Sequence, residues 1–185
     1  MKNVLMVVSG PSGVGKGTLV KRLVKERDDV VESVSCTTRA PRAGEVHGRE
    51  YYFLSKEEFL RRIGDDDFLE HDEHFGNFYG TPKSFVKEKL KEKSVILEID
   101  VVGGLNAKKA FPDCVLVMIA PPSLEVLKAR LSGRNSETEE EIENRLSRLE
   151  YELSKKDEYD YTLVNDDLNV ALKELGAILD KEKNK

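Results

Sequence analysis

The most informative stretch of the chain is Gly10-Pro11-Ser12-Gly13-Val14-Gly15-Lys16-Gly17-Thr18. It follows a continuous apolar run at residues 4–8, which is typical of a strand buried on both faces of a parallel sheet. Apolar residues at helical spacing begin at Leu19, directly after it. The sequence therefore predicts a buried strand, a glycine-rich loop and a helix, in that order.

This is the context in which the phosphate-binding P-loop motif is meaningful. Glycines let successive backbone N–H groups point at phosphate oxygens, and the helix N-terminus adds its positive end. Lys16 is expected to reach the β- and γ-phosphates of a nucleotide. The alternative is a glycine-rich turn with a chance lysine, but strand, spacing and helix together favour the P-loop. We predict that the whole quoted stretch binds the nucleotide.

The loop departs from the usual motif after Lys16, where Gly17 replaces the Ser or Thr that ligates Mg²⁺. A hydroxyl arrives one residue later, at Thr18. Mg²⁺ tolerates this because it keeps several waters and binds substrate phosphates. We therefore expect Mg²⁺ to be held through water and phosphates, with no direct protein ligand. The departure argues against a switch GTPase, which needs that ligand.

The remainder of the chain alternates strands and helices. Apolar runs at residues 94–99 and 114–119 each lead into a helical pattern, and a strand at 161–164 precedes a helix at 168–179. Such alternation predicts an α/β fold with a doubly wound parallel sheet. Ligands of these sheets bind outside the carboxyl ends of the strands.

Composition narrows the class of protein. Of 185 residues, 30 are basic and 35 acidic, so the chain lacks the basic excess typical of nucleic-acid binders. Its two cysteines, Cys36 and Cys114, show no disulfide or zinc-site spacing, which favours a reducing cytosol. No apolar run is long enough for a signal peptide or a membrane span. We expect a soluble, cytoplasmic protein without nucleic-acid or membrane partners, and its oligomeric state stays open.

The segment around Arg39 and Arg42 has the chemistry of a second phosphate site. Arginine guanidinium groups match phosphate oxygens bidentately, and the hydroxyls of Tyr51 and Tyr79 are further donors. The alternative is a solvated loop whose arginines pair with surface acids. Charge pattern alone leaves both interpretations open.

Residues 33–45, Ser-Val-Ser-Cys-Thr-Thr-Arg-Ala-Pro-Arg-Ala-Gly-Glu, resemble the signature of guanylate kinases. That family also has the Gly-Lys-Gly-Thr form of the P-loop and blocks similar to residues 75–81, 99–104 and 134–140, in the same order. The resemblance covers nearly the whole chain. It implies a P-loop NTP hydrolase-like fold, ATP with Mg²⁺ as phosphoryl donor, and GMP or dGMP as acceptor.

The resemblance also implies roles for individual residues. The acceptor phosphate is assigned to Arg39, Arg42, Tyr51 and Tyr79. The guanine base is assigned to Ser35, Glu70, Thr81 and Asp100. The chemistry is consistent, because guanine presents N1–H and an exocyclic amine to one carboxylate, whereas adenine has an acceptor at N1. Without the resemblance, Glu70 is one surface acid among several.

Glu98 and Asp100 follow the apolar part of a strand, where an acid of a P-loop kinase lies beside the metal. Asp100 is also placed to cap the next helix. The sequence favours a ligand-facing Asp100, and both roles are compatible. Whether Asp100 contacts guanine or metal-bound water stays open.

Phosphoryl transfer is catalysed mainly by positioning and positive charge. Lys16 is one candidate, and the resemblance places Arg134 and Arg145 on the transferred group. It places Arg130 on the donor phosphates or at a hinge, and Asn165 at the adenine of ATP. The alternative is salt bridging along an exposed helix, which is the interpretation we keep for Arg148.

We predict one domain with three parts. The core comprises residues 1–34, 81–123 and 149–185, a GMP-binding insertion spans 35–80, and a lid spans 124–148. The expected activity is transfer of the γ-phosphoryl of ATP to GMP. The alternatives are a non-catalytic guanylate kinase-like module that binds proteins, and a kinase for another nucleotide or a sugar phosphate.

Overall fold

The computed structural model describes residues 2–74, 76–132 and 139–185. Its main sheet has five parallel strands, in the spatial order β2, β7, β1, β8, β9. Their bounds are β1 Leu5–Ser9, β2 Val30–Glu32, β7 Ser94–Glu98, β8 Val115–Ala120 and β9 Tyr161–Val164. The predicted α/β fold with a parallel sheet is confirmed.

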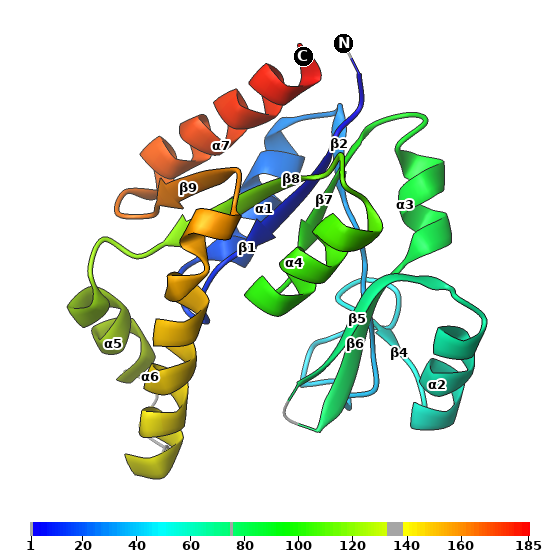
Figure 1. The fold of residues 1–185 in the computed structure, drawn as a ribbon, viewed down its shortest axis with the longest axis horizontal. Coiled ribbons are helices and arrows are strands. Elements are labelled where there is room, and N and C mark those ends of the chain that lie inside the picture. The colour runs from blue at the N-terminus through cyan, green and yellow to red at the C-terminus, as the bar shows by residue number, and fades with distance from the viewer. Residues whose placement is uncertain (1, 75, 133–138) are drawn as a thin grey trace.

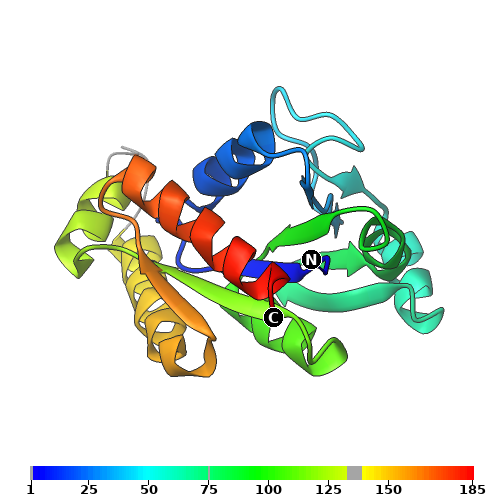
Figure 2. The same ribbon diagram turned by 90° about the horizontal axis from the view of Figure 1, so that it is seen from above.

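Helices cover both faces of this sheet (Figures 1 and 2). Alternate residues of β1 point to opposite faces, as the pleat requires. Met6 and Val8 pack in one buried cluster with residues of α1 (Lys16–Glu26) and α7 (Leu168–Lys183). Leu5 and Val7 pack in the other with residues of α3 (Lys83–Lys89) and α4 (Val101–Ala110). Burial on both faces explains why the strand is continuously apolar.

A second, smaller sheet lies beside the first and has the strand order β4, β3, β6, β5. Its strands are β3 Cys36–Thr37, β4 Tyr52–Phe53, β5 Phe68–His74 and β6 Asn77–Pro82, and helix α2 spans Lys56–Gly64. This unit has its own core, in which the rings of Phe59 and Phe68 stack with centroids 4.4 Å apart. The long β5–β6 hairpin is prominent in Figure 1.

Helices α5 (Leu124–Ser132) and α6 (Glu139–Ser154) lie on the opposite side of the molecule from the small sheet (Figure 1). A short 3₁₀ helix, η1 (Lys156–Glu158), leads from α6 towards β9. Leu149 anchors α6 to the main core, because it is 3% exposed and belongs to the cluster of α1 and α7.

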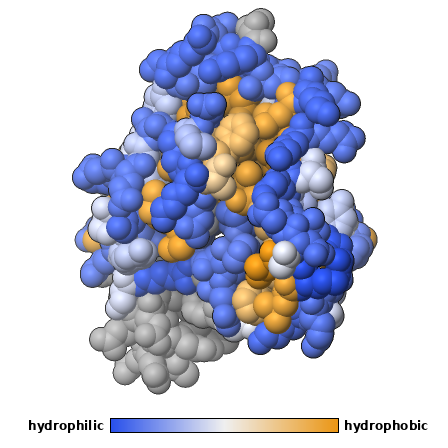
Figure 3. All heavy atoms as spheres, turned by 45° about the vertical axis from the view of Figure 1, so that its right-hand side comes forward, coloured by the Kyte–Doolittle hydropathy of each residue, from blue (hydrophilic) through white to orange (hydrophobic). Residues whose placement is uncertain are grey.

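The face shown in Figure 3 is mainly hydrophilic, with two apolar patches. Within the described ranges, no helix combines the length and apolar character needed to cross a bilayer.

Candidate active site

A cavity of about 250 Å³ lies between the two sheets, at the carboxyl end of β7. It is lined by six of the residues predicted from the sequence: Lys16, Ser35, Tyr51, Glu70, Tyr79 and Asp100. The other lining residues are Asp72, Gly80, Glu98, Ile99 and Gly103. The P-loop, the small sheet and the end of β7 thus contribute to one site, where ligands of parallel sheets bind.

Glu70 is a buried acid in the cavity wall, and its side-chain partner is the buried Thr81. They face each other across the β5–β6 hairpin, and the Thr81 hydroxyl donates to Glu70 Oε1 at 2.6 Å. Burial raises the pKa of Glu70 to about 7, against the opposing effect of this hydrogen bond. A buried carboxylate with one hydroxyl partner retains acceptor capacity for further donors. It is suited to bind neighbouring N–H groups of a ligand.

Asp100 lies at the N-terminus of α4, and its Oδ1 accepts from the Gly103 backbone N–H at 2.7 Å. The side chain therefore caps the helix and also lines the cavity, while its contact with a ligand stays a prediction. Glycine at position 103 gives these carboxylates room, because a Cβ there would lie 3.1 Å from Glu70 Oε2 and 3.3 Å from Asp100 Oδ1. The positive end of α4 thereby approaches two carboxylates.

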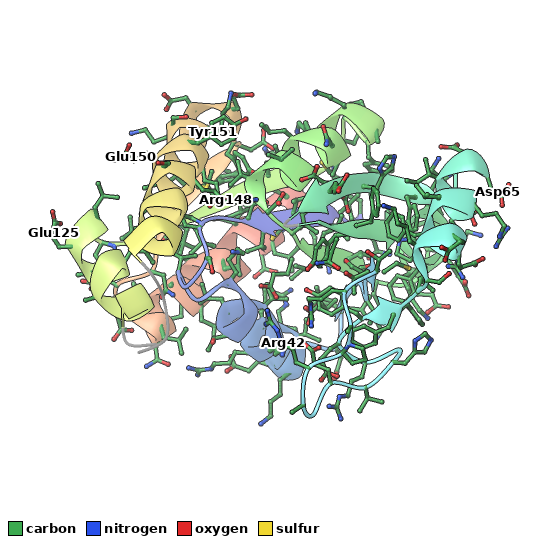
Figure 4. All side chains as sticks on the ribbon, turned by 90° about the horizontal axis from the view of Figure 1, so that it is seen from below. Arg42, Asp65, Glu125, Arg148, Glu150 and Tyr151 are labelled. Carbon is green, nitrogen blue, oxygen red and sulfur yellow. The ribbon has the colours of Figure 1, made fainter. Side chains whose placement is uncertain are left out.

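The arginine-rich segment before β4 contributes two cations of different exposure. Arg39 pairs with Glu45 through contacts of 2.9 and 3.0 Å, and its guanidinium lies over the Tyr51 ring. The Glu45 hydrogen bonds raise the pKa of Arg39. Arg42 is exposed and lies on the α1 side of the segment (Figure 4). Tyr51 and Tyr79 meet edge to face at 6.0 Å.

The P-loop wraps the N-terminus of α1, which begins at Lys16. Gly15 adopts φ 97°, and a Cβ there would lie 2.5 Å from Asn165 Nδ2. Asn165 is buried and donates to the Val14 carbonyl at 2.8 Å. In the structure Asn165 therefore braces the loop from the end of β9, while its contact with adenine stays a prediction.

The Lys16 ammonium donates to the carbonyls of Gly10 and Pro11 at 2.6 and 3.1 Å. Burial lowers the pKa of Lys16, while the nearby charges of Glu98, Glu152 and Asp100 raise it. Lys16 is thus a cation that lines the cavity close to three acids. An anionic ligand in the cavity would form an ion pair with it.

The space beside Gly17 is occupied by an acid. A Cβ on Gly17 would lie 3.1 Å from Glu98 Oε2, so Glu98 stands next to the position that usually holds a metal-binding hydroxyl. Carboxylate oxygens suit Mg²⁺. The carboxylates of Glu98 and Asp100 line the same cavity as Lys16. Within the described part of the chain, no three acidic, His or Cys side chains cluster as a metal site.

Two residues that the sequence interpretation left aside also belong to this region. Arg148 donates to Asp100 Oδ2 at 3.1 Å and to Glu152 Oε1 at 3.0 Å. We expected Arg148 to form salt bridges along an exposed helix. Arg148 does pair with the residue four positions further along α6, but this residue, Glu152, is only 5% exposed. Its second partner, Asp100, lines the cavity. The i,i+4 spacing of Arg148 and Glu152 was the only sequence signal.

Three predicted arginines cannot be placed. Arg134 lies outside the described residues, and the side chains of Arg130 and Arg145 are likewise outside the description, although their backbones belong to α5 and α6. Of the remaining P-loop residues, Ser12 and Thr18 are exposed on the loop and on the first turn of α1.

Comparison with known proteins matches residues 2–182 to the guanylate kinase family model. A guanylate kinase of Clostridium perfringens is 51% identical over 98% of this chain and 85% of its own length. The chain belongs to the guanylate kinase family. A crystal structure of guanylate kinase from Anaplasma phagocytophilum has a TM-score of 0.81 and 34% identity, covering 100% of this chain and 87% of that one.

A shikimate kinase from Bacteroides thetaiotaomicron shares the fold at TM-score 0.55 and 15% identity, with coverage of 96% and 98%. This likeness bears on the fold alone. In this member of the guanylate kinase family, the cavity between the two sheets is the candidate substrate site.

Proposed function

We propose that the cavity binds GMP and that the P-loop presents ATP to it. The chain transfers the γ-phosphoryl group of ATP to GMP, giving ADP and GDP, which is the activity of its family. One observation supports the placement of the acceptor: the buried Glu70 carboxylate, which accepts from Thr81, lines the same cavity as the P-loop lysine. A non-catalytic module has no need of that combination.

Glu70 and Thr81 select guanine in this proposal. The ionised Glu70 carboxylate accepts from N1–H and the exocyclic amine, while Thr81 keeps donating to its Oε1. Adenine places an acceptor opposite the carboxylate, so two acceptors would face each other. Ser35 and Asp100 border the same base, and Arg39, Arg42, Tyr51 and Tyr79 receive the GMP phosphate.

The chemical step needs no general base, because the attacking GMP phosphate is already an anion. A GMP phosphate oxygen attacks the γ-phosphorus in line, the bond to the β–γ bridging oxygen breaks, and ADP leaves with that electron pair. Lys16 and the loop N–H groups stabilise the charge on the donor. Arg134 and Arg145 supply further positive charge from the lid, residues 124–148, while the insertion, residues 35–80, carries the acceptor.

Mg²⁺ would accompany ATP and would neutralise part of the charge on its phosphates. Glu98 and Asp100 are the carboxylates that would hold its water ligands. Gly17 offers no hydroxyl, and the Glu98 carboxylate lies where such a side chain would project. Arg130 and Asn165 would border the donor nucleotide.

Replacing Glu70 with Gln tests the acceptor site. The amide presents an N–H to the guanine donors, so we expect KM for GMP to rise by roughly 10- to 100-fold, with KM for ATP nearly unchanged. Glu73→Gln is the matched control, because Glu73 is an exposed acid on the same strand. Steady-state kinetics with GMP and AMP as acceptors measures both effects. Unchanged KM and selectivity for GMP in Glu70→Gln would refute the base pocket.

A further inference from the structure

Arg148 connects helix α6 to the strand-end acid of the acceptor cavity. Its Nη2 and Nε bind Asp100 and Glu152 at 3.1 and 3.0 Å. In Figure 4 its side chain lies on the inner side of α6, whereas Glu150 of the same helix lies on the outer side. Asp100 is 48 residues away in sequence, so this contact joins separate parts of the fold.

The environment distinguishes Arg148 from an ordinary surface ion pair. Arg22 and Glu26 also pair across one helical turn, but their side chains are 40% and 54% exposed. The corresponding exposures of Arg148 and Glu152 are 31% and 7%. A buried carboxylate is costly unless it is paired, so Glu152 holds the guanidinium of Arg148 firmly in place. Arg148 is therefore held by a residue of its own helix while it also bonds Asp100.

The two oxygens of Asp100 are held from two directions. Oδ1 accepts from the Gly103 N–H at the start of α4, and Oδ2 accepts from Arg148 on α6. Together these bonds restrain the carboxylate at both of its oxygens. The charges of Glu152, Asp100 and Arg148 all act on Lys16. The network thus borders the P-loop lysine as well as the acceptor cavity.

We propose that Arg148 is a positioning residue for phosphoryl transfer, acting through Asp100. By fixing the Asp100 carboxylate, it keeps helix α6 docked at the carboxyl end of β7, with Asp100 oriented towards the substrates. Arg145 precedes Arg148 by one turn of the same helix. The contact therefore aligns the lid helix with the acceptor cavity. This inference rests on the proposed function of that cavity.

The test is a kinetic cycle with Arg148→Met, which keeps the aliphatic length but removes both hydrogen bonds. We expect kcat with GMP to fall at least about tenfold, because misalignment of this size costs rate. KM for ATP should change less than about threefold, since the P-loop contacts remain. In an Asp100→Asn background the same substitution should lower kcat by less than about threefold, since its target is already lost. Arg148→Lys should recover part of the rate.

Controls separate positioning from folding. Arg22→Met removes an exposed i,i+4 pair and should leave kcat and the melting temperature nearly unchanged. If Arg148→Met fails to fold because Glu152 is left unpaired, Arg148→Met with Glu152→Gln removes the buried charge, and the same loss of kcat is expected.

Two results would overturn the inference: Arg148→Met with at least half of the normal kcat, or an undiminished loss in the Asp100→Asn background. The second result would mean that Arg148 acts independently of Asp100. The unaltered chain is assayed alongside. If it phosphorylates GMP while Arg148→Met does so equally well, only the role of Arg148 is lost. If the unaltered chain does not accept GMP, the proposed function itself fails.

Discussion

Glu70 shows how position in the fold changes the chemistry of a residue. It belongs to an acidic stretch with Asp65, Asp66, Asp67, Asp72 and Glu73, and of these only Glu70 is buried. The β5–β6 register places it opposite Thr81, whose hydroxyl satisfies one oxygen and leaves acceptor capacity. Charge pattern in the sequence does not separate Glu70 from its neighbours, because burial depends on pairing with a distant strand.

The raised pKa of Glu70 predicts a pH dependence of acceptor binding. With a pKa of about 7, the carboxyl is mainly neutral below pH 7 and mainly ionised above it. Only the ionised form accepts both guanine N–H donors. We expect KM for GMP to rise about tenfold as pH falls from 8 to 6, with a smaller change in KM for ATP.

Glu70→Gln is the control for this pH profile, because the GMP phosphate also titrates near pH 6. The variant retains phosphate titration but has no carboxyl at position 70. Its KM for GMP, although raised, should depend on pH only through the phosphate. An identical pH profile in both proteins would show that Glu70 is not the titrating group.

The N-terminus of α4 is the structural element on which the base pocket depends. Here the capping side chain of Asp100 and the carboxylate of Glu70 both lie close to Gly103. The aspartate cap is readable from sequence, as is the strand before it. The close approach at Gly103 cannot be predicted from sequence, because the Glu70 carboxylate that causes it belongs to the small sheet.

Gly103→Ala tests this arrangement. The added methyl would lie 3.1 Å from Glu70 Oε2, so the carboxylate has to move and we expect KM for GMP to rise about tenfold. Helix propensity favours Ala by roughly 0.5–1 kcal/mol, so the protein should remain folded. Gly176→Ala in α7 is the control, because its methyl would meet only Leu23 Cδ1, at 3.7 Å. Equal KM values for GMP in both variants would contradict the proposed close approach.

Elements differed in how well the sequence predicted them. Continuous apolar runs identified β1, β7 and β8 because strands buried on both faces need no polar residue. Strand β5, with the sequence Phe-Leu-Glu-His-Asp-Glu-His, has mostly polar residues, and β2 has only three. Their pairing partners, β6 and β7, define them rather than their own composition. Helix α7 continues to Lys183, beyond the predicted end at residue 179.

At the scale of the whole molecule, an acidic protein carries a site of mixed charge. The formal net charge is −5, and the cavity between the sheets is lined by Lys16 together with Glu70, Asp72, Glu98 and Asp100, the last of which is bonded by Arg148. Positioned cations matter more than net charge for phosphoryl transfer. Six of the residues predicted as site residues line this cavity, and their roles stay predictions. For Arg148 we expected only salt bridges along its helix, because its other partner, Asp100, lies in another part of the chain.

The division into core, insertion and lid follows the same logic and stays a proposal. The small sheet has its own core, and α5 and α6 lie across the molecule from it, so substrates would bind between separately supported parts. Closure of the lid would exclude water, which otherwise hydrolyses ATP.

The most direct test of the account is ADP formation from Mg-ATP with GMP, dGMP, AMP, CMP or UMP as the acceptor. The Glu70–Thr81 pair is proposed to bind the base alone, so it predicts turnover with GMP and dGMP and almost none with the other three. Strong turnover with AMP, CMP or UMP would contradict the guanine pocket while leaving the kinase fold intact. Measurable GMP binding with no turnover of any acceptor would contradict the phosphoryl-transfer function itself.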